Sequence, residues 1–198
     1  MMDRRGTINR KTAETDIALT LALDGAGEAR VSTGCGFLDH MLAQLTRHGR
    51  FDLQLTCRGD AQVDYHHITE DCGIALGQAF AQALGDGRGI ARYGSFLLPM
   101  DEALVLAALD ISGRCHLSYE LAPAAQTVGD FDTELVQEFF WGLCRGLGLT
   151  LHLRQLAGGN AHHILEAAFK GVGRALCLAV EMDARAAGRI PSTKGVLL

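Results

Sequence analysis

The sequence predicts an α+β fold built from an internally duplicated ββαβα unit, so that two similar halves each form a mixed sheet packed on helices. Two observations predict this class. The same order of strand-like and helix-like patterns occurs in both halves of the 198-residue chain. In addition, a His-His-x-x-Glu motif opens the final predicted helix of each half, at 66–70 and, 96 residues later, at 162–166. Similarity at a fixed spacing indicates an internal repeat.

The first half begins with alternating apolar residues. Ile17, Leu19 and Leu21 occupy every second position of the stretch 15–25, which predicts a half-buried strand, and Asp24-Gly25 indicates a turn. Apolar residues spaced three and four apart predict helices further on. The other expected elements are a returning strand at 28–34, a helix at 37–49 that stops at Gly49, a strand at 51–57 and a helix at 66–85.

The second half repeats this order. Its expected elements are strands at 103–113 and 114–122, a helix at 132–148 with Asp132 or Thr133 as N-cap, a strand at 149–158 and a helix at 161–183. The first helices of the two halves also align at an offset of 98, which pairs His40 with Glu138 and Arg47 with Arg145. We therefore expect a single duplicated domain over 1–198, with halves at approximately 7–92 and 93–190.

Composition excludes several classes of protein. Hydrophobic residues make up 48% of the chain and charged residues 21%, as in a globular domain, and a net charge of −5 without a long basic run argues against a nucleic-acid partner. The sequence has neither an apolar run long enough to cross a membrane nor a secretory signal, so we expect a cytoplasmic protein. We expect the six cysteines to be small core residues in a reducing compartment rather than disulfide or zinc partners.

The repeated motif has the geometry of a metal site. Successive helical residues turn by about 100°, so His66 and Glu70 share one helix face, as do His162 and Glu166. His67 and His163 point about 100° away, which suits ligation of a different ion. Imidazole with carboxylate is suitable for Mn²⁺, Fe²⁺ or Zn²⁺. The alternative is a surface feature of a helix start, which the matched second copy disfavours.

Longer motifs extend this picture. The sequence resembles the imidazoleglycerol-phosphate dehydratase family from about residue 10 to residue 197. The stretches that carry the resemblance are TGCGFLDHMLAQLTRHGRFDL, DYHHITEDCGIALGQA, RYGSFLLPMDEAL, DISGR, HLRQLAGGNAHHILEAAFKGVGRAL and PSTKGVL. The resemblance implies a ribosomal protein S5 domain 2-like fold, assembly into a 24-mer, and two Mn²⁺ ions per subunit at sites between subunits.

The resemblance also implies two sets of metal ligands. One set is His40, His67, His162 and Glu166, and the other is His66, Glu70, Glu138 and His163. Glu138 departs from the family pattern, in which a histidine often precedes the two phenylalanines. A carboxylate can replace imidazole on Mn²⁺, and its charge should raise cation affinity. A buried, satisfied histidine remains the alternative for His40, and a solvated helix carboxylate remains the alternative for Glu138.

The implied reaction is the dehydration of D-erythro-imidazole glycerol phosphate to imidazole acetol phosphate in L-histidine biosynthesis. Ring deprotonation between two metals would give an imidazolate, and loss of hydroxide would give a diazafulvene-like intermediate whose neighbouring C–H is acidic. By resemblance, Glu14 is the catalytic glutamate, although by pattern alone it is an exposed carboxylate at a strand edge. The histidines and glutamates of the two HHxxE motifs and His40 complete the expected catalytic set.

Substrate contacts also follow from the resemblance. They are Glu14, Gln44, Arg92, Arg114, Lys170, Ser192, Thr193 and Lys194, several of which would bind a phosphate dianion. We expect the segment PSTKG to be a mobile loop that orders over the ligand. A solvated surface charge is the alternative for each arginine and lysine, and we assign it to Arg47, Arg88, Arg145 and Arg174. We expect His48, His116 and His152 to be structural or solvated.

Two other functions remain open from the sequence. A dinuclear hydrolase on the same fold would use a metal-bound water as nucleophile and would tolerate the loss of Glu14. A non-catalytic metal-binding or shell-forming protein would lack affinity for a phosphorylated ligand. Substitution of Glu14 separates the dehydratase from the hydrolase, and substitution of Arg92, Arg114 and Lys194 separates an enzyme from a binding protein.

Overall fold

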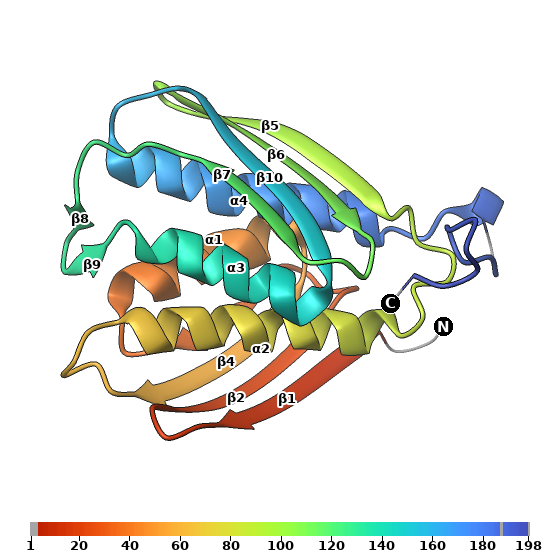
Figure 1. Ribbon diagram of the computed structural model, residues 1–198, viewed down its shortest axis with the longest axis horizontal. Helices are drawn as coiled ribbons and strands as arrows, with labels where there is room; N and C mark the ends of the chain where they lie inside the picture. Colours follow the sequence, from red (N-terminus) through yellow and green to blue (C-terminus); the bar gives the residue numbers. More distant parts are fainter. Residues whose placement is uncertain (1–3, 187, 198) are drawn as a thin grey trace.

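A computed structural model describes residues 4–186 and 188–197. Within them the chain forms two four-stranded sheets as outer layers, with the long helices enclosed between them (Figure 1). Alternation of apolar residues explains the inner strands: in β6 every second residue, from Ala103 to Ile111, is buried against the helices. The observed architecture is α+β with two similar halves, so the predicted fold class is confirmed.

The elements follow one another in the same order in each half. The first half contains β1 (Arg5–Lys11), β2 (Thr15–Ala22), β3 (Ala29–Ser32), α1 (Gly36–Gly49), β4 (Asp52–Gly59) and α2 (His66–Leu84). The second contains β5 (Tyr93–Met100), β6 (Ala103–Ile111), β7 (His116–Glu120), the short pair β8 (Thr127–Val128) and β9 (Phe131–Asp132), α3 (Leu135–Leu147), β10 (Leu149–Ala157) and α4 (Ala161–Val180). A 3₁₀ turn at Ala184–Ala186 follows.

Both sheets have the same topology. The strand orders are β1-β2-β4-β3 and β5-β6-β10-β7, and in each sheet the fourth strand joins its neighbour in parallel while the other pairs are antiparallel. The short pair β8–β9 is an insertion in the second half alone. Strand pairing therefore shows the duplication independently of the histidine motifs.

The structure adds one strand to the start of each expected half. β1 and β5 were not expected. In β1 the less exposed face carries a single large apolar residue, Ile8. In β5 both faces carry apolar residues, since Tyr93 and Leu97 are exposed while Leu98 is buried, so no alternation of apolar and polar residues marks the strand. Each becomes a strand by pairing with β2 or β6.

The buried glycines Gly6 of β1 and Gly94 of β5 are equivalent by position. A side chain at either would strike the backbone of the helix beneath, at Ala79 or at Ala175. The repeated unit is therefore βββαβα.

The expected return of 28–34 onto the preceding strand was wrong. β3 pairs in parallel with β4 on the far side of the sheet, and β2 takes β1 as its hairpin partner. The connection through Ala26, Gly27 and Glu28 crosses the sheet end because all three backbone N–H groups donate to Oδ1 of Asp52. A side chain distant in sequence thus decides the direction of this segment.

The start of α3 differs from the expected position by a residue or two. The N-cap of α3 is Glu134 rather than Asp132 or Thr133, because Asp132 lies in β9 and the Thr133 hydroxyl donates to the carbonyls of Ala125 and Gln126. α1 ends at Gly49 as expected, and the C-cap residue that follows, Arg50, adopts the left-handed conformation with φ 58°. The other expected helices and strands are observed within a few residues.

Helix packing joins the two halves. α1 of the first half packs on α4 of the second, and α3 of the second half packs on α2 of the first. Glycines allow close approach: a side chain at Gly173 would strike the carbonyl of Leu45, and one at Gly142 would lie 2.5 Å from the carbonyl oxygen of Glu70. Each helix pair therefore places one helix of each half side by side, which positions the functional side chains.

The remaining sequence expectations concern the cysteines and membranes. All six cysteines are free, and Cys35, Cys57, Cys72 and Cys144 are buried as expected, whereas Cys115 is exposed and Cys177 partly so. None of the helices among the described residues is long and apolar enough to cross a membrane.

Candidate metal centre

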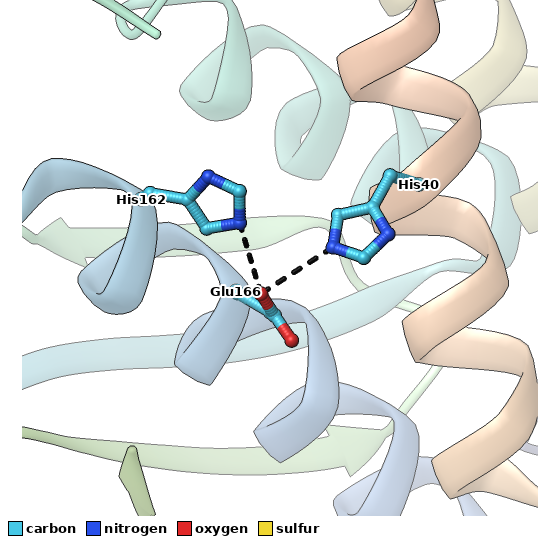
Figure 2. A group of neighbouring side chains, drawn as sticks. All are labelled: His40, His162 and Glu166. Carbon is cyan, nitrogen blue, oxygen red and sulfur yellow. Dashed lines mark hydrogen bonds and ion pairs between the residues drawn. The ribbon is translucent and has the colours of Figure 1, made fainter. Parts of the chain in front are cut away.

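Three side chains converge where α1 crosses α4 (Figure 2). Nε2 of His162 lies 3.0 Å from Oε2 of Glu166, and Nε2 of His40 lies 3.4 Å from the same oxygen. The three potential ligand atoms lie within 4.8 Å of one another. His40 comes from the first half and the other two from the second, so the interlocked helices build this group. We call this group of His40, His162 and Glu166 the first centre.

Burial and charge distinguish the members of the first centre. The Glu166 side chain is 7% exposed, whereas those of His40 and His162 are 42% and 41% exposed. Burial raises the pKa of Glu166, but the hydrogen bond and charge of Lys170, with a smaller contribution from His40, outweigh it and lower the pKa overall. The carboxylate is therefore charged and anchored, with both imidazoles facing it from the accessible side.

Lys170 forms an ion pair with Glu166 that the sequence did not predict. Its Nζ lies 2.6 Å from Oε1 of Glu166, one helical turn earlier, and near Sδ of Met100 at 3.7 Å. The spacing of four residues does place Lys170 on the metal-ligand face, as expected from the sequence. Its contact with phosphate stays a prediction.

The internal repeat predicts a second candidate centre on α2 and α3, which we call the second centre. The counterparts of His40, His162 and Glu166 are Glu138, His66 and Glu70, and the helices that carry them pack together. Within the described part of the chain, however, only the first centre has three ligand atoms as close as 4.8 Å. Instead, Nη1 of Arg145 lies 2.6 Å from Oε1 of Glu70.

Arg145, interpreted from the sequence as a solvated surface charge, is half-exposed and in addition forms this ion pair. Its side chain is 53% exposed, yet it forms an ion pair with a candidate metal ligand and lies over the ring of Trp141 at 5.9 Å. The signal was present in the repeat, since Arg145 lies two turns after Glu138 on the same face of α3.

The second histidine of each motif points elsewhere, as the helix geometry predicted. Nδ1 of His67 lies 2.9 Å from Asp60, which follows β4, and Nδ1 of His163 lies 2.8 Å from Glu102, in the turn between β5 and β6. These hydrogen bonds are the main reason why the pKa of each histidine is raised. A carboxylate on Nδ1 fixes the ring and leaves Nε2 available to a ligand, an arrangement common among metal-binding histidines.

Asp60 and Glu102 were missed by sequence reasoning. Glu102 is held by more than the histidine: it also accepts from the backbone N–H groups of Gly159 and Asn160, and these contacts together with His163 lower its pKa to about 2. An aspartate or glutamate in a strand-end turn has no periodicity that would have revealed its partner on a distant helix.

Glu14 lies in the turn between β1 and β2, with an exposed side chain. The turn lines one side of an open hollow of about 340 Å³, and Asp60 lines the other. The charge of Glu14 adds to the rise in the pKa of His67, after the larger effect of Asp60. The candidate catalytic glutamate thus lies in the neighbourhood of one HHxxE motif.

The other predicted substrate contacts are spread along the chain. Arg92 is tied to Asp110 by two hydrogen bonds of 2.7 and 3.1 Å and to the carbonyl of Pro191 at 2.7 Å. It thereby holds the segment that carries the exposed or partly exposed Ser192, Thr193 and Lys194. Arg114 is exposed in the turn after β6, and Gln44 is half-buried one turn after His40 on α1. Their contacts with substrate stay predictions.

The donors of the first centre suit a divalent metal ion. Two imidazole nitrogens and an ionised carboxylate oxygen meet at one point, and the carboxylate is already buried and charged. Imidazole and carboxylate together bind Mn²⁺, Fe²⁺ or Zn²⁺. The second centre offers one imidazole and two carboxylates, a harder donor set.

Comparison with protein families matches residues 33–176 to the family described as "Imidazoleglycerol-phosphate dehydratase". This match covers most of the chain and includes both HHxxE motifs. The chain belongs to the imidazoleglycerol-phosphate dehydratase family. The family's enzymes are hydro-lyases, so this protein is one as well.

Individual relatives agree over nearly the full length. The imidazoleglycerol-phosphate dehydratase of Synechococcus sp. (strain CC9605) is 59% identical over 196 residues, covering 99% of this chain and 97% of the relative. That of Dinoroseobacter shibae is 60% identical over 194 residues, covering 98% and 100%. The resemblance stated from the sequence is confirmed.

Solved structures of the same family have the same fold. The enzyme from Pyrococcus furiosus, in complex with (S)-C348, superposes with a TM-score of 0.82 at 39% identity and covers 96% of this chain and 100% of its own. The enzyme from Staphylococcus aureus gives a TM-score of 0.80 at 38% identity and covers 90% of this chain and 99% of its own. These family members share the duplicated arrangement of two sheets around four helices.

Proposed function

We propose that the protein catalyses the manganese-dependent dehydration of D-erythro-imidazole glycerol phosphate to imidazole acetol phosphate in L-histidine biosynthesis. Family membership supports the overall reaction. The single observation that carries the metal requirement is the convergence of His40, His162 and Glu166 across two helices. Lys170 pairs with Oε1 of Glu166, whereas Oε2 lies between the two accessible imidazoles, so a divalent cation at Oε2 would have three ligand atoms ready.

Two ions per subunit follow from the repeat. His40, His162 and Glu166 would hold one, and Glu138, His66 and Glu70 would hold the other. His67 and His163, fixed through Nδ1 by Asp60 and Glu102, would each complete an ion site with Nε2. When bound, such ions stabilise negative charge on the substrate's imidazole ring and orient it. The imidazole ring of the substrate has two nitrogens, so two metal centres could each bind one of them.

The chain's own residues would handle the protons and the phosphate. After loss of hydroxide from the carbon attached to the ring, a diazafulvene-like intermediate has an acidic C–H on the next carbon. The exposed carboxylate of Glu14 is suited to accept that proton, and the resulting enol becomes the ketone. Arg92, Arg114, Lys170, Ser192, Thr193 and Lys194 would bind the phosphate, and Gln44 would contact the substrate beside His40.

Assembly into a 24-mer is part of this proposal. Large apolar side chains remain exposed on the single chain, including Val63, Tyr93, Leu97, Leu156, Met182 and Val196. In addition, His67 and His163 are turned toward carboxylates away from the helix-crossing centres, so their Nε2 atoms are suited to ions held by a neighbouring subunit. Symmetric closure would complete each site. The biosynthetic role and reduced cysteines suit a cytoplasmic location.

The test combines metal analysis with turnover. Purified protein should contain two manganese equivalents per chain, and dialysis against a chelator should abolish conversion of imidazole glycerol phosphate, which added Mn²⁺ should restore. Full activity in chelator-treated, demonstrably metal-free protein would contradict the metal requirement. Release of inorganic phosphate instead of imidazole acetol phosphate would favour the hydrolase hypothesis. A chain that binds metal but converts no substrate would favour the non-catalytic one.

A further inference from the structure

A buried carboxylate stands directly after the candidate ligand Glu70 on α2. Asp71 is only 7% exposed, although an unpaired buried carboxylate is costly. Its Oδ2 accepts a hydrogen bond of 2.5 Å from Oγ1 of Thr15 and lies 2.5 Å from Nη1 of Arg10. Thr15 begins β2 and Arg10 lies near the end of β1, so Asp71 joins both strands to the helix.

The segment held in this way is the turn that carries Glu14. Thr12 organises it: its backbone N–H donates to the carbonyl of Thr15 at 2.9 Å, and its hydroxyl accepts from the N–H groups of Glu14 and Thr15 at 3.1 and 2.9 Å. The Glu14 side chain itself is exposed. The position of its carboxylate therefore depends on the turn, and the turn is attached to α2 through Thr15 and Asp71.

Helix geometry explains how α2 serves two purposes. Glu70 and Asp71 are adjacent, so their side chains diverge by about 100°. Glu70 faces α3 and pairs with Arg145, whereas Asp71 faces the β1–β2 turn. One rigid helix thus holds a candidate metal ligand and the anchor of the candidate proton carrier in adjacent positions.

The repeat provides an internal control. The turn between β5 and β6 corresponds to the Glu14 turn, and the counterpart of Asp71 on α4 is the buried Ala167. There the turn residue Glu102 is tied down directly by His163, Gly159 and Asn160. The first half therefore anchors its turn through the buried Asp71, whereas the second half anchors its turn through the side chain of Glu102.

We infer that Asp71 is a positioning residue for the reaction, which fixes Glu14 relative to the metal-binding helix through Thr15, with Arg10 compensating its charge. This inference rests on the proposed role of Glu14. Asp71 touches no substrate; it acts by holding the turn in place. A displacement of about 1 Å at a catalytic group can cost about 100-fold in rate.

The test compares two substitutions at one position. Thr15→Val keeps the shape and removes the hydroxyl, and Thr15→Ser keeps the hydroxyl. We expect Thr15→Val to lower kcat by about 10- to 100-fold, with KM and manganese content unchanged. Thr15→Ser should restore kcat to within about twofold, since its hydrogen bond to Asp71 is retained. Thr20→Val on the same strand is the matched control. Hydrogen exchange of residues 12–16 should accelerate in Thr15→Val alone.

Combination with Glu14→Gln separates this inference from the function it rests on. If Glu14→Gln alone retains turnover, the proposed role of Glu14 fails. If Glu14→Gln is impaired while folded Thr15→Val keeps its kcat, the positioning role of Asp71 is overturned. If the losses of kcat in the two single variants multiply in the Glu14→Gln, Thr15→Val double variant, Thr15 acts independently of Glu14 and the inference is overturned. Loss of manganese from Thr15→Val would also overturn it. Asp71→Asn, which keeps an oxygen acceptor for Thr15 but loses the charge facing Arg10, should show a smaller kcat defect of the same kind; an intact kcat would argue against the inference.

Discussion

The two helix crossings of this protein are built from equivalent positions but differ in charge. At the α1–α4 crossing, two histidines face one glutamate, and the compensating cation, Lys170, comes from the same helix as that glutamate. At the α2–α3 crossing, the position of His40 is taken by Glu138, and the compensating cation, Arg145, comes from the opposite helix. A carboxylate in place of an imidazole adds a negative charge, so the α2–α3 crossing has two carboxylates and one imidazole where the α1–α4 crossing has one carboxylate and two imidazoles.

The turns beside the two motifs differ in a complementary way. In the second half, the turn glutamate Glu102 is bonded to His163, and its pKa is lowered to about 2. In the first half, Asp60 takes over this contact with His67, and Glu14 in the turn stays exposed. The two similar halves therefore use different residues to hold the second histidine: the turn glutamate Glu102 in the second half, and Asp60 after β4 in the first.

The largest expected effect tests whether both crossings bind metal. Glu166→Gln and Glu70→Gln should each lower the manganese content from two ions toward one per chain and reduce kcat by about 100-fold or more, because a charged ligand is lost. Inductively coupled plasma mass spectrometry and turnover measure this, with the exposed Glu134→Gln as control. If Glu70→Gln keeps two ions, the α2–α3 crossing is a salt bridge and the two crossings are not equivalent.

Next in size are the residues that orient the second histidines. Asp60→Asn and Glu102→Gln should each weaken manganese retention by about 10- to 100-fold, because Nδ1 loses its charged acceptor and the ring its fixed orientation. Chelator competition monitored by electron paramagnetic resonance provides the measurement. Similar losses would show that the two turns share this role. No loss for Asp60→Asn would mean that Glu14, rather than Asp60, orients His67.

Glu138→His would make the residue types of the two crossings alike. We expect the manganese affinity of this crossing to fall by less than about tenfold, because a ligand atom remains and only one negative charge is lost. Even the loss of a hydrogen-bonding partner of a metal ligand costs about tenfold or more. The metal preference of the α2–α3 crossing should shift from Mn²⁺ toward Zn²⁺, which accepts imidazole ligands readily. Competition between the two ions would show the shift; an unchanged preference and affinity would indicate that Glu138 is only a solvated helix carboxylate.

The smallest expected effect concerns the compensating cation. Arg145→Gln should tighten metal binding at the α2–α3 crossing by about two- to fivefold, because a half-exposed ion pair that competes for Glu70 is worth at most about 1 kcal/mol. Lys170→Gln removes the cation that competes for Glu166, so metal binding at the α1–α4 crossing should also tighten, and turnover should fall if Lys170 binds phosphate. Titration of metal-free protein with Mn²⁺ gives both affinities. Weaker binding in Arg145→Gln would show that the arginine supports the site.

Much of the site could be predicted from the sequence because it is encoded by local periodicity. Four-residue spacing predicted that His162 and Glu166 share a face, and their hydrogen bond confirms it. The one-residue offset predicted that His67 and His163 point elsewhere, as they do. The helices and inner strands were predictable for the same reason, since apolar alternation and helical spacing are written in neighbouring residues.

The features that were missed depend on partners distant along the chain. β1 has few large apolar residues and β5 has apolar residues on both faces, so neither is marked as a strand by its own pattern, and both are strands through pairing with β2 and β6. Asp60, Glu102, Arg145 and Asp71 look like ordinary surface charges until the fold places a histidine, a glutamate or a threonine beside them.

The sequence by itself determined the duplicated α+β class, the ligand types and the face each one occupies, because covalent spacing and helix pitch determine those directions. Only the tertiary structure decided that each centre takes one helix from each half. That choice depends on long-range packing, in which Gly142 and Gly173 permit close helix contact. The same packing carries Glu14 to its place through the buried contact of Thr15 with Asp71. Such contacts form between surfaces rather than along the chain, so no local pattern records them.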